Sequence, residues 1–263
     1  MRLTAVVTVR NEERNLRALL DSLVVQDQPF EVVVVDAHSD DRTREIVKSF
    51  SKEYPFVHLY LHGGTRGAGR NHGVAKASGE AVAFIDGDCI ASPFWARHLR
   101  DGLASSEIAA GKTIQIGYRP FEDLERVELI YQGYDITYPS CNLAYRKAAF
   151  EAVGGFDPWF LTAEDIDLNL RSVQRGFRIR YRPDAMVYHR TRGSAFDFLK
   201  QALWNGAGRK QLTWKHGQLW SNYRPLEMFR RTHTGWSLAR LLAASLGYVG
   251  YKVFGRPRPP DRR

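Results

Sequence analysis

The sequence predicts an α/β protein with a doubly wound, mostly parallel sheet, followed by a helical carboxyl-terminal extension. Short apolar runs rich in valine and isoleucine alternate with segments of helical periodicity, which is typical of βα units joined by right-handed crossovers. Several of these runs end abruptly in acidic residues, as strands do where a parallel sheet opens into a ligand crevice. The 263 residues, 44% of them hydrophobic, suffice for one large core.

Four apolar runs in the amino-terminal half are predicted as strands: residues 3–9, 31–36, 57–61 and 81–86, of which 31–36 and 81–86 are expected to be buried. Helices with leucine, isoleucine or valine on one face follow the first two runs. Their expected N-caps are Asn11 and the Ser39-Asp40-Asp41 segment. A flexible glycine-rich loop at 63–71 is expected to lead into a third helix.

The second half continues the pattern less regularly. The remaining predicted elements are helices opened by Pro93, Lys147 and the 162–167 segment, and strands at 108–116, 177–182 and 186–189. Residues 117–140 give no clear prediction. Gly176 is expected to end the helix that starts within 162–167.

The fourth strand ends in Asp86-Gly87-Asp88. Two carboxylates with no side chain between them offer hard oxygen donors at the carboxyl edge of the sheet. Such a pair is suited to a divalent cation that bridges to a phosphate. The alternative is an ordinary turn, since Asp and Gly are also turn residues.

Charge is distributed unevenly along the chain. Residues 1–170 hold 18 Lys and Arg against 25 Asp and Glu, a balance of −7, whereas residues 171–263 hold 20 against 4, a balance of +16. The basic portion indicates a polyanionic partner: nucleic acid, an anionic membrane surface, or phosphate groups on a substrate. A merely solvated basic face is the alternative.

Cys89 and Cys141 are the only cysteines in the sequence. Two are too few for a disulfide framework or a Cys-based zinc site, so we expect buried free thiols in an intracellular protein. No stretch approaches the roughly 20 apolar residues of a spanning helix. The apolar run that starts the chain is expected to be a strand, because it is too short for a signal sequence.

Taken in order, these motifs resemble the family 2 glycosyltransferases of the GT-A fold, a Rossmann-like architecture. The resemblance covers about the first 190 residues. Its motifs are Asn11-Glu12-Glu13, Asp36 with Ser39 and Asp40, Gly69-Arg70-Asn71, Asp86-Gly87-Asp88, Asn142, Gly154-Gly155-Phe156-Asp157, Glu164-Asp165, Asp167-Leu168, Pro183 and His189. It implies a catalytic domain at 1–192, an extension at 193–263, and metal-dependent, inverting transfer of one sugar from a UDP- or GDP-sugar.

The resemblance also implies roles for the donor-side residues. Asp88 would hold Mg²⁺ or Mn²⁺, which neutralises the departing nucleoside diphosphate. Asp86 would bind the metal or the ribose, and His189 would reach back to the metal or the diphosphate. Asp36 would accept a hydrogen bond from the nucleobase. The implied remainder of the donor pocket is Val9, Arg10, Glu12 and Gly87, with Arg66 and Arg70 supplying positive charge beside the phosphates or pairing with neighbouring acids.

On the acceptor side, the resemblance assigns the catalytic base to Asp165. A base must remove the proton of the attacking hydroxyl in an inverting transfer. The first turn of a helix favours the ionised form of Asp165. Its alternative role is to cap that helix. Transfer onto a polyprenyl or dolichyl phosphate is a variant that needs no base.

Two departures from the family pattern matter. Ala37 and His38 follow Asp36 where a second acid is usual, which puts base contacts through that acid in doubt. The Gln-x-x-Arg-Trp signature of processive synthases is absent, because residues 201–205 lack the arginine. A transferase of single sugars is therefore favoured over a polymerase.

The extension combines amphipathic, aromatic and basic segments. Residues 198–204 predict a helix and residues 206–210 a flexible joint, and four of the six tryptophans lie between Trp204 and Trp236. The uncharged run 241–251 would be a helix only about 16 Å long. We expect peripheral attachment to the cytoplasmic face of a membrane and a lipid-linked or other glycan acceptor. The alternative is a helix packed on the catalytic core.

Two other classes of function remain open. A sugar nucleotidyltransferase also has a glycine-rich loop, but there the loop follows the first strand, whereas 63–66 follows the third. A non-catalytic basic binding module is the other. No nucleic-acid-binding motif is visible, so we expect no nucleic-acid partner.

Overall fold

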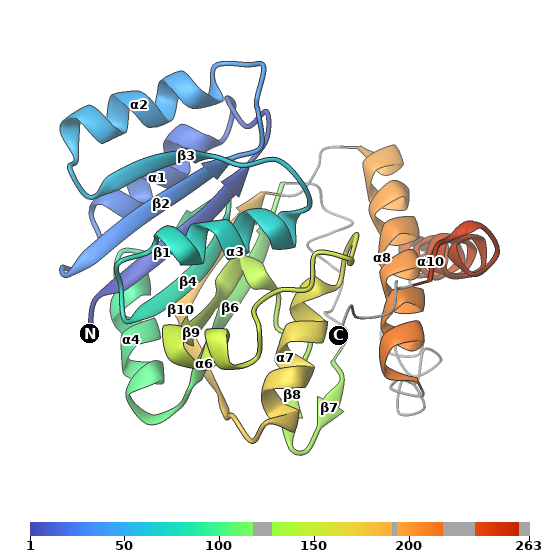
Figure 1. Ribbon diagram of the computed structural model, residues 1–263. Helices are drawn as coiled ribbons and strands as arrows, with labels where there is room; N and C mark the ends of the chain where they lie inside the picture. Colours follow the sequence, from blue (N-terminus) through green and yellow to red (C-terminus); the bar gives the residue numbers. More distant parts are fainter. Residues whose placement is uncertain (118–127, 191–193, 218–234, 258–263) are drawn as a thin grey trace.

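The computed structural model describes residues 1–117, 128–190, 194–217 and 235–257. An eight-stranded mixed sheet runs through its larger part (Figure 1). The strands, in spatial order, are β3 (Val57–Leu61), β2 (Phe30–Asp36), β1 (Leu3–Val9), β4 (Ala81–Asp86), β9 (Leu143–Arg146), β6 (Ile108–Ile116), β10 (Ile179–Arg190) and β5 (Cys89–Ala91). A small second sheet pairs β7 (Ile130–Tyr131) with β8 (Tyr134–Asp135).

Strands β3, β2, β1 and β4 are all parallel, and β6 is parallel to β10. The mostly parallel sheet predicted from the sequence is therefore confirmed. Two short strands run the other way: β9 between β4 and β6, and β5 on the outer edge of β10. The pairing of β5 with β10 brings Cys89 opposite His189, 100 positions later in the chain.

Helices cover both faces of the sheet (Figure 1). One face carries α1 (Leu16–Val24), α2 (Thr43–Glu53) and α4 (Trp95–Ser105), and the other carries α3 (Arg66–Lys76), α6 (Lys147–Ala152) and α7 (Glu164–Gln174). Side chains alternate between the two faces of a strand, so Ala5 and Val7 join the first core cluster and Val6 joins the second. Strand β2 is buried along its whole length, as its unbroken apolar run predicts.

The prediction of a flexible loop at 63–71 is wrong from residue 66 onward, because α3 already begins at Arg66. The hydroxyl of Thr65 caps this helix by accepting from the Ala68 N–H. Gly73 allows α3 to lie close to the sheet, since a Cβ there would come within 2.5 Å of Val6 Cγ1. Asn11 is not the N-cap of α1, which begins at Leu16 after Asn15.

Strand β10 (Ile179–Arg190) is one long strand where two short strands, 177–182 and 186–189, were predicted. The register of β10 against β6 shifts between Arg182 and Met186. Pro183 lies in that interval, where it cannot donate a ladder hydrogen bond and is tolerated at an irregularity. The predicted break is therefore a bulge within a continuous strand.

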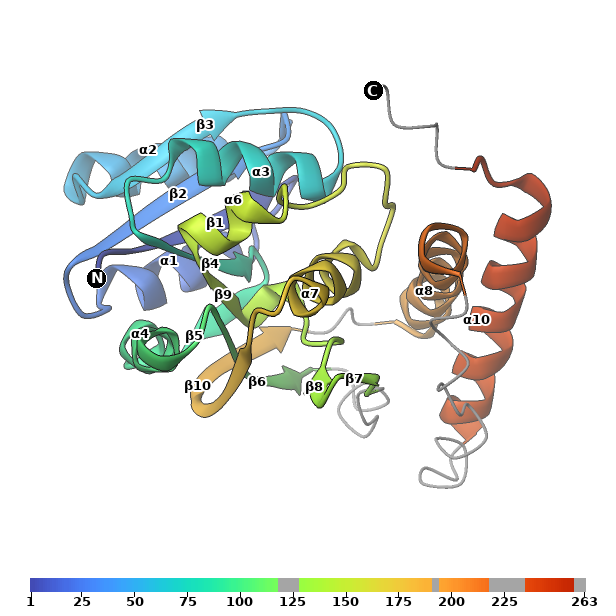
Figure 2. The same ribbon diagram turned by 60° about the horizontal axis from the view of Figure 1, so that its bottom comes forward.

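The extension forms two packed helices, α8 (Ala195–His216) and α10 (Gly235–Phe254). In Figures 1 and 2, α8 lies next to the core and α10 lies on its far side. The flexible joint expected at 206–210 is wrong, because these residues lie inside α8. Gly206 and Gly247 instead permit helix contact: a Cβ on either would lie 1.9 Å from a backbone oxygen of the other helix, that of Ala244 or Leu203.

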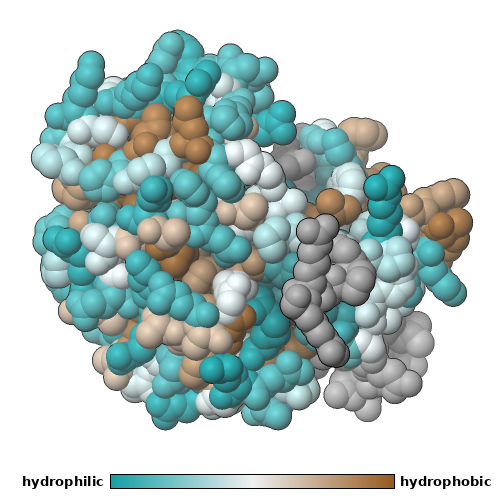
Figure 3. Space-filling view, in the orientation of Figure 1, coloured by the Kyte–Doolittle hydropathy of each residue, from teal (hydrophilic) through white to brown (hydrophobic). Residues whose placement is uncertain are grey.

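The outer face of α10 is apolar and exposed. Its exposed side chains include Leu238, Leu242, Leu246, Val249 and Val253, and Figure 3 shows apolar residues at the edge of the molecule that α10 forms. These positions share one helix face by their spacing, opposite Ala244 and Gly247. Within the described ranges, none of the helices is both long and apolar enough to cross a bilayer.

Candidate active site

The parallel register brings the predicted donor-side residues to one edge of the sheet. Val9 lies opposite Asp36, and Thr8 lies opposite Asp86. Gly87 then lies against the end of β1, because a Cβ there would come within 2.9 Å of Val9 Cγ1 and 3.1 Å of Glu12 Cγ. Arg10 is exposed directly after β1. The structure thus gathers residues that are up to 79 positions apart in the sequence.

Asp36 is fully buried and holds the loop after β2 in place. Its Oδ1 accepts from the Ser39 N–H at 2.8 Å, and its Oδ2 accepts from the Ser39 hydroxyl at 2.5 Å. The Ser39 hydroxyl also accepts from the Asn11 N–H at 2.9 Å. A carboxylate has further lone pairs, so this arrangement is compatible with a hydrogen bond to a nucleobase, which stays a prediction.

Arg70 joins the Asp-Gly-Asp edge to helix α7. Its guanidinium donates to Asp86 Oδ1 at 2.7 Å and to Glu164 Oε1 at 2.6 Å, and Arg70 is 1% exposed. Of the two roles that the sequence left open for Arg70, pairing with neighbouring acids is the one observed. Burial alone would raise the pKa of Asp86, but the charge and hydrogen bond of Arg70, together with the charges of Arg66 and His189, outweigh burial and lower the pKa, so Asp86 is ionised at neutral pH.

Arg66 lies at the start of α3 and is exposed. Its positive charge also helps to lower the pKa of Asp86. Arg66 therefore acts on the same edge of the sheet as Arg70 without being buried in an ion pair. Guanidinium groups suit phosphate oxygens, so the predicted role beside a diphosphate remains available to Arg66.

Asp88, Cys89 and His189 form a group of possible metal ligands, with their ligand atoms all within 4.8 Å of one another. His189 Nε2 lies 3.3 Å from Asp88 Oδ1, and its Nδ1 lies 3.0 Å from Gln115 Oε1. Burial opposes the charge of His189, but the hydrogen bond to Asp88 and nearby negative charges raise its pKa to about 9. Oxygen and nitrogen donors at this spacing fit a divalent cation such as Mn²⁺.

Asp165 is held in the first turn of α7. Its Oδ2 accepts from the Ser140 N–H at 3.0 Å and its Oδ1 from the Ile166 N–H at 2.9 Å. Burial and the adjacent charge of Glu164 raise the pKa of Asp165 to about 6. The residue before this pair, Ala163, has a left-handed φ of 66°, a conformation that L-residues rarely adopt and that is often found at functional sites.

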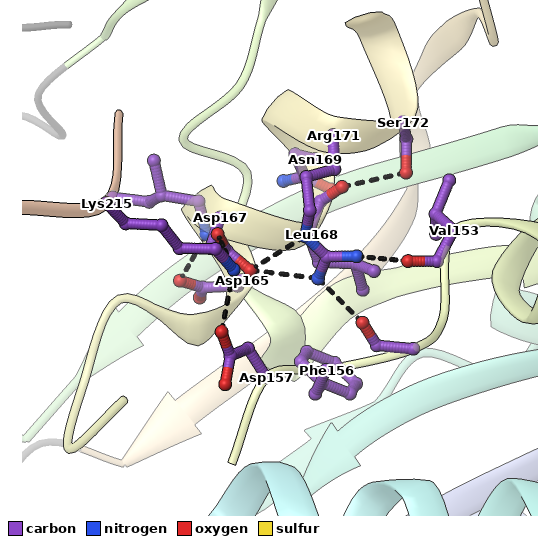
Figure 4. Close-up of polar contacts among 12 residues, drawn as sticks. Val153, Phe156, Asp157, Asp165, Asp167, Leu168, Asn169, Arg171, Ser172 and Lys215 are labelled. Carbon is purple, nitrogen blue, oxygen red and sulfur yellow. Dashed lines mark hydrogen bonds and ion pairs between the residues drawn. The ribbon is translucent and has the colours of Figure 1, made fainter. Parts of the chain in front are cut away.

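Sequence reasoning missed a buried charge cluster around Asp167, two residues after Asp165 on α7 (Figure 4). Asp167 is fully buried and accepts from Lys215 Nζ and His216 Nε2, each at 2.7 Å, and from Arg171 at 2.9 Å. Burial alone would raise the pKa of Asp167, but these donors outweigh burial and lower the pKa to about 2. Lys215 also lies 2.7 Å from Asp157 Oδ2, so α8 is joined to both α7 and the loop before it.

Comparison with known proteins supports one family. The model described as glycosyl transferase family 2 matches residues 4–153, and that described as glycosyl transferase family group 2 matches residues 136–254. Similar curated proteins include glycosyltransferase AglE of Haloferax volcanii, 27% identical over 80% of this chain and 73% of that protein. Another is the pre-mycofactocin glycosyltransferase of Mycobacterium tuberculosis, 28% identical over 81% of this chain and 48% of that protein.

The probable glycosyltransferase YdaM of Bacillus subtilis is 26% identical over 82% of this chain and 55% of that protein. The chain thus spans about half the length of two of these three relatives.

Solved structures share the fold at low identity. S. aureus TarS in complex with UDP-GlcNAc has a TM-score of 0.61 and 20% identity, over 93% of this chain and 79% of that one. Mannosyltransferase PcManGT from Pyrobaculum calidifontis, in complex with GDP-Man and Mn²⁺, has a TM-score of 0.64 and 20% identity, over 97% and 76%. The GT-A fold expected from the sequence is confirmed. Because the family 2 model matches more than half of the sequence, the chain belongs to glycosyl transferase family 2.

Proposed function

We propose that this chain is a metal-dependent, inverting glycosyltransferase that moves one sugar from a nucleoside-diphosphate sugar to an acceptor hydroxyl. The observation that carries the proposal is the buried Arg70, which bridges Asp86 at the metal edge to Glu164 beside Asp165. One rigid ion-pair chain thereby sets the distance between the group that would stabilise the leaving diphosphate and the group that would accept a proton. Positioning of this kind is a main source of rate in transfer reactions.

On the donor side, Asp88 and His189, with Asp86 beside them, would hold Mg²⁺ or Mn²⁺. A cation bound there supplies positive charge to the diphosphate oxygens as the anomeric bond breaks. Arg66 adds a second positive charge near Asp86. Val9, Arg10, Glu12, Asp36 and Gly87 would form the pocket for the nucleoside. Relatives that bind UDP-GlcNAc or GDP-Man support a nucleotide-sugar donor without deciding which base this chain prefers.

On the acceptor side, Asp165 would remove the proton of the attacking hydroxyl. The Ser140 N–H holds one oxygen of this carboxylate in place, and a pKa of about 6 leaves Asp165 mostly ionised at neutral pH. Attack opposite the leaving diphosphate inverts the anomeric centre. The chain lacks the processive signature in residues 201–205, which supports transfer of a single sugar.

The acceptor is proposed to be lipid-linked and presented at the cytoplasmic face of a membrane. Helix α10 turns a stripe of exposed apolar side chains away from α8, with Leu242 57% and Leu246 68% exposed. The basic portion of the chain, +16 over residues 171–263, would attract anionic headgroups. A helix that lies in the interface, with its apolar face in the acyl region, accounts for both features.

The test is an assay of nucleoside diphosphate release by the full chain with UDP-, GDP- and dTDP-sugars and an acceptor hydroxyl. We expect release that stops with EDTA, returns with Mn²⁺, and falls at least 100-fold in Asp165→Asn. Asp184→Asn, a change of the same type at an exposed acid, is the control. Release that survives both EDTA and Asp165→Asn would overturn the proposal.

Two other outcomes would redirect the assignment. Full activity of Asp165→Asn with a polyprenyl phosphate acceptor would indicate transfer onto a phosphate, because that nucleophile is already ionised. Formation of pyrophosphate instead of nucleoside diphosphate would indicate a nucleotidyltransferase.

A further inference from the structure

Cys89 places a sulfur beside the carboxylate of Asp88. The side chain is fully buried at the start of β5, and its Sγ lies 3.9 Å from Asp88 Oδ1. The same carboxylate oxygen lies 3.3 Å from His189 Nε2. One sulfur, one oxygen and one nitrogen thus converge on a common point.

The spacing suits a tetrahedral cation. Ligands that lie about 2.0–2.3 Å from one tetrahedral ion are about 3.3–3.8 Å from each other. The observed separations of 3.3 Å and 3.9 Å fall on or next to this interval, and the third is at most 4.8 Å. Shifts well under 1 Å at two side chains would bring all three atoms into bonding distance.

The backbone and a hydrogen bond fix the arrangement. Cys89 and His189 are directly opposite each other in the antiparallel pairing of β5 with β10. Gln115 of β6 lies 3.0 Å from His189 Nδ1, which directs Nε2 toward Asp88. Metal-binding histidines are commonly oriented by such a bond at the other ring nitrogen.

Sulfur changes which metals the site prefers. Mg²⁺ and Mn²⁺ favour oxygen ligands, whereas Zn²⁺ and Co²⁺ bind thiolate and imidazole strongly. We propose that Asp88, Cys89 and His189 form a site for thiophilic divalent cations, Zn²⁺ above all, which overlaps the Mg²⁺ or Mn²⁺ site of the proposed function. On binding, the Cys89 thiol and the protonated His189 ring each release one proton to solvent, and the freed sulfur and Nε2 bond to the ion. Since both kinds of cation use Asp88, they compete.

Cobalt titration of the full chain tests the site directly. We expect a thiolate-to-cobalt charge-transfer band in the near ultraviolet, intense visible bands of a four-coordinate ion, and loss of both on adding one equivalent of Zn²⁺. Cys89→Ser should lose the charge-transfer band and bind Zn²⁺ at least tenfold more weakly in competition with a chromophoric chelator. Cys141→Ser removes the thiol that lies against Cys89 and should keep the band, because the bonding sulfur is that of Cys89.

Two results would overturn the proposal: no charge-transfer band in the unaltered chain, or a band that persists in Cys89→Ser and disappears in Cys141→Ser. Circular dichroism checks that each variant is folded, and Cys89→Ala provides a second test of the same sulfur. The competition with Mg²⁺ or Mn²⁺ rests on the proposed function, but the titration uses no donor sugar. Failure to transfer a sugar and failure to bind cobalt through sulfur are therefore separate outcomes.

Discussion

Lys215 Nζ lies 2.7 Å from Asp167 Oδ1, in an ion pair that connects the last turn of α8 to the helix that carries Asp165 (Figure 4). Asp167 is fully buried, and Lys215 makes a second 2.7 Å contact with Asp157. Gln211 of α8 adds hydrogen bonds to the backbone of Trp159 and Leu161. The extension is therefore fastened to the loop and helix that position the proposed base.

We expect Lys215→Met to loosen this connection. The change leaves Asp167 with His216 and Arg171 but removes one charged partner from a buried carboxylate, at a cost of about 1–3 kcal/mol. The apparent Tm should fall by about 2–10 °C, and kcat should fall about tenfold because Asp165 is less well positioned. Lys200→Met, at an exposed position of the same helix, should change neither. Equal behaviour of the two variants would contradict a positioning role for Lys215.

Substitutions of Arg70 show whether activity depends on the geometry of its contacts with Asp86 and Glu164 or only on its positive charge. Arg70→Lys keeps a positive charge, but a single ammonium cannot reproduce the two-armed guanidinium contact. We expect Arg70→Lys to lower kcat at least tenfold with a moderate loss of Tm, and Arg70→Met to cost about 3–5 kcal/mol by leaving the buried Glu164 and the partly buried Asp86 without their guanidinium partner. Arg175→Lys, at an exposed arginine, is the matched control. If Arg70→Lys keeps the kcat of the unaltered chain, the two-armed guanidinium contact is not needed for activity.

The central strands could be predicted because their signal is local. Four short runs rich in apolar residues leave few alternatives to β1, β2, β3 and β4, and the parallel register then brings Asp36 and Asp86 to one edge. By contrast, β9 has only four residues, and its antiparallel insertion between β4 and β6 is decided by long-range pairing. Gly206 was interpreted as a joint because local propensity favours flexibility, whereas packing against Ala244 requires glycine inside a helix.

The site contacts that sequence reasoning missed join distant segments of the chain. Asp167 and Lys215 are 48 positions apart, and an ion pair of that separation leaves no periodic pattern. Cys89 was correctly expected to be a buried free thiol. Its place beside His189 follows from a strand pairing that composition and spacing do not encode. Pairing of Arg70 with acids was one of its two expected roles, but nothing in the sequence indicates that its buried partner is Glu164, 94 positions away.

The raised pKa of Asp165 predicts the acidic limb of the activity profile. With a pKa of about 6, the base is protonated below that pH, so kcat/KM should rise with pH through about 6 and then level. The limb should vanish in Asp165→Asn, whose residual activity should be at least 100-fold lower. A pH profile that is unchanged in Asp184→Asn and lost in Asp165→Asn identifies the group; a limb that persists in Asp165→Asn assigns it elsewhere.

The same shift has a consequence for stability. The folded-state pKa of Asp165 lies above its ordinary value of 3.8, so the folded protein holds this proton more tightly than the unfolded chain does. The stabilisation is complete below about pH 3.8 and is lost as pH rises through about 6. Asp165→Asn removes the charge, so its Tm relative to the unaltered chain should be higher at pH 8 than at pH 5. A Tm difference that does not vary with pH would refute the shift.

The exposed stripe on α10 predicts binding to anionic membranes. Leu242 and Leu246 are 57% and 68% exposed and stand one turn apart, on the face opposite the α8 contact at Ala244 and Gly247. Replacing both leucines with serine removes apolar surface that would enter the acyl region, at roughly 1 kcal/mol or more per side chain. We expect the double variant to sediment with phosphatidylglycerol vesicles at least tenfold more weakly, which corresponds to about 1.4 kcal/mol.

The matched control is Val25→Ser. Val25 lies on the surface of the catalytic domain and is 66% exposed, like the two leucines. Val25→Ser should leave vesicle binding unchanged, because Val25 lies at the end of α1, outside the extension. Binding should also weaken with added salt, since the basic residues act through screened charges, and it should be weaker on vesicles of phosphatidylcholine alone. If the double variant and Val25→Ser bind vesicles equally, the apolar face of α10 does not contact the bilayer, and a protein partner becomes the better candidate for covering it.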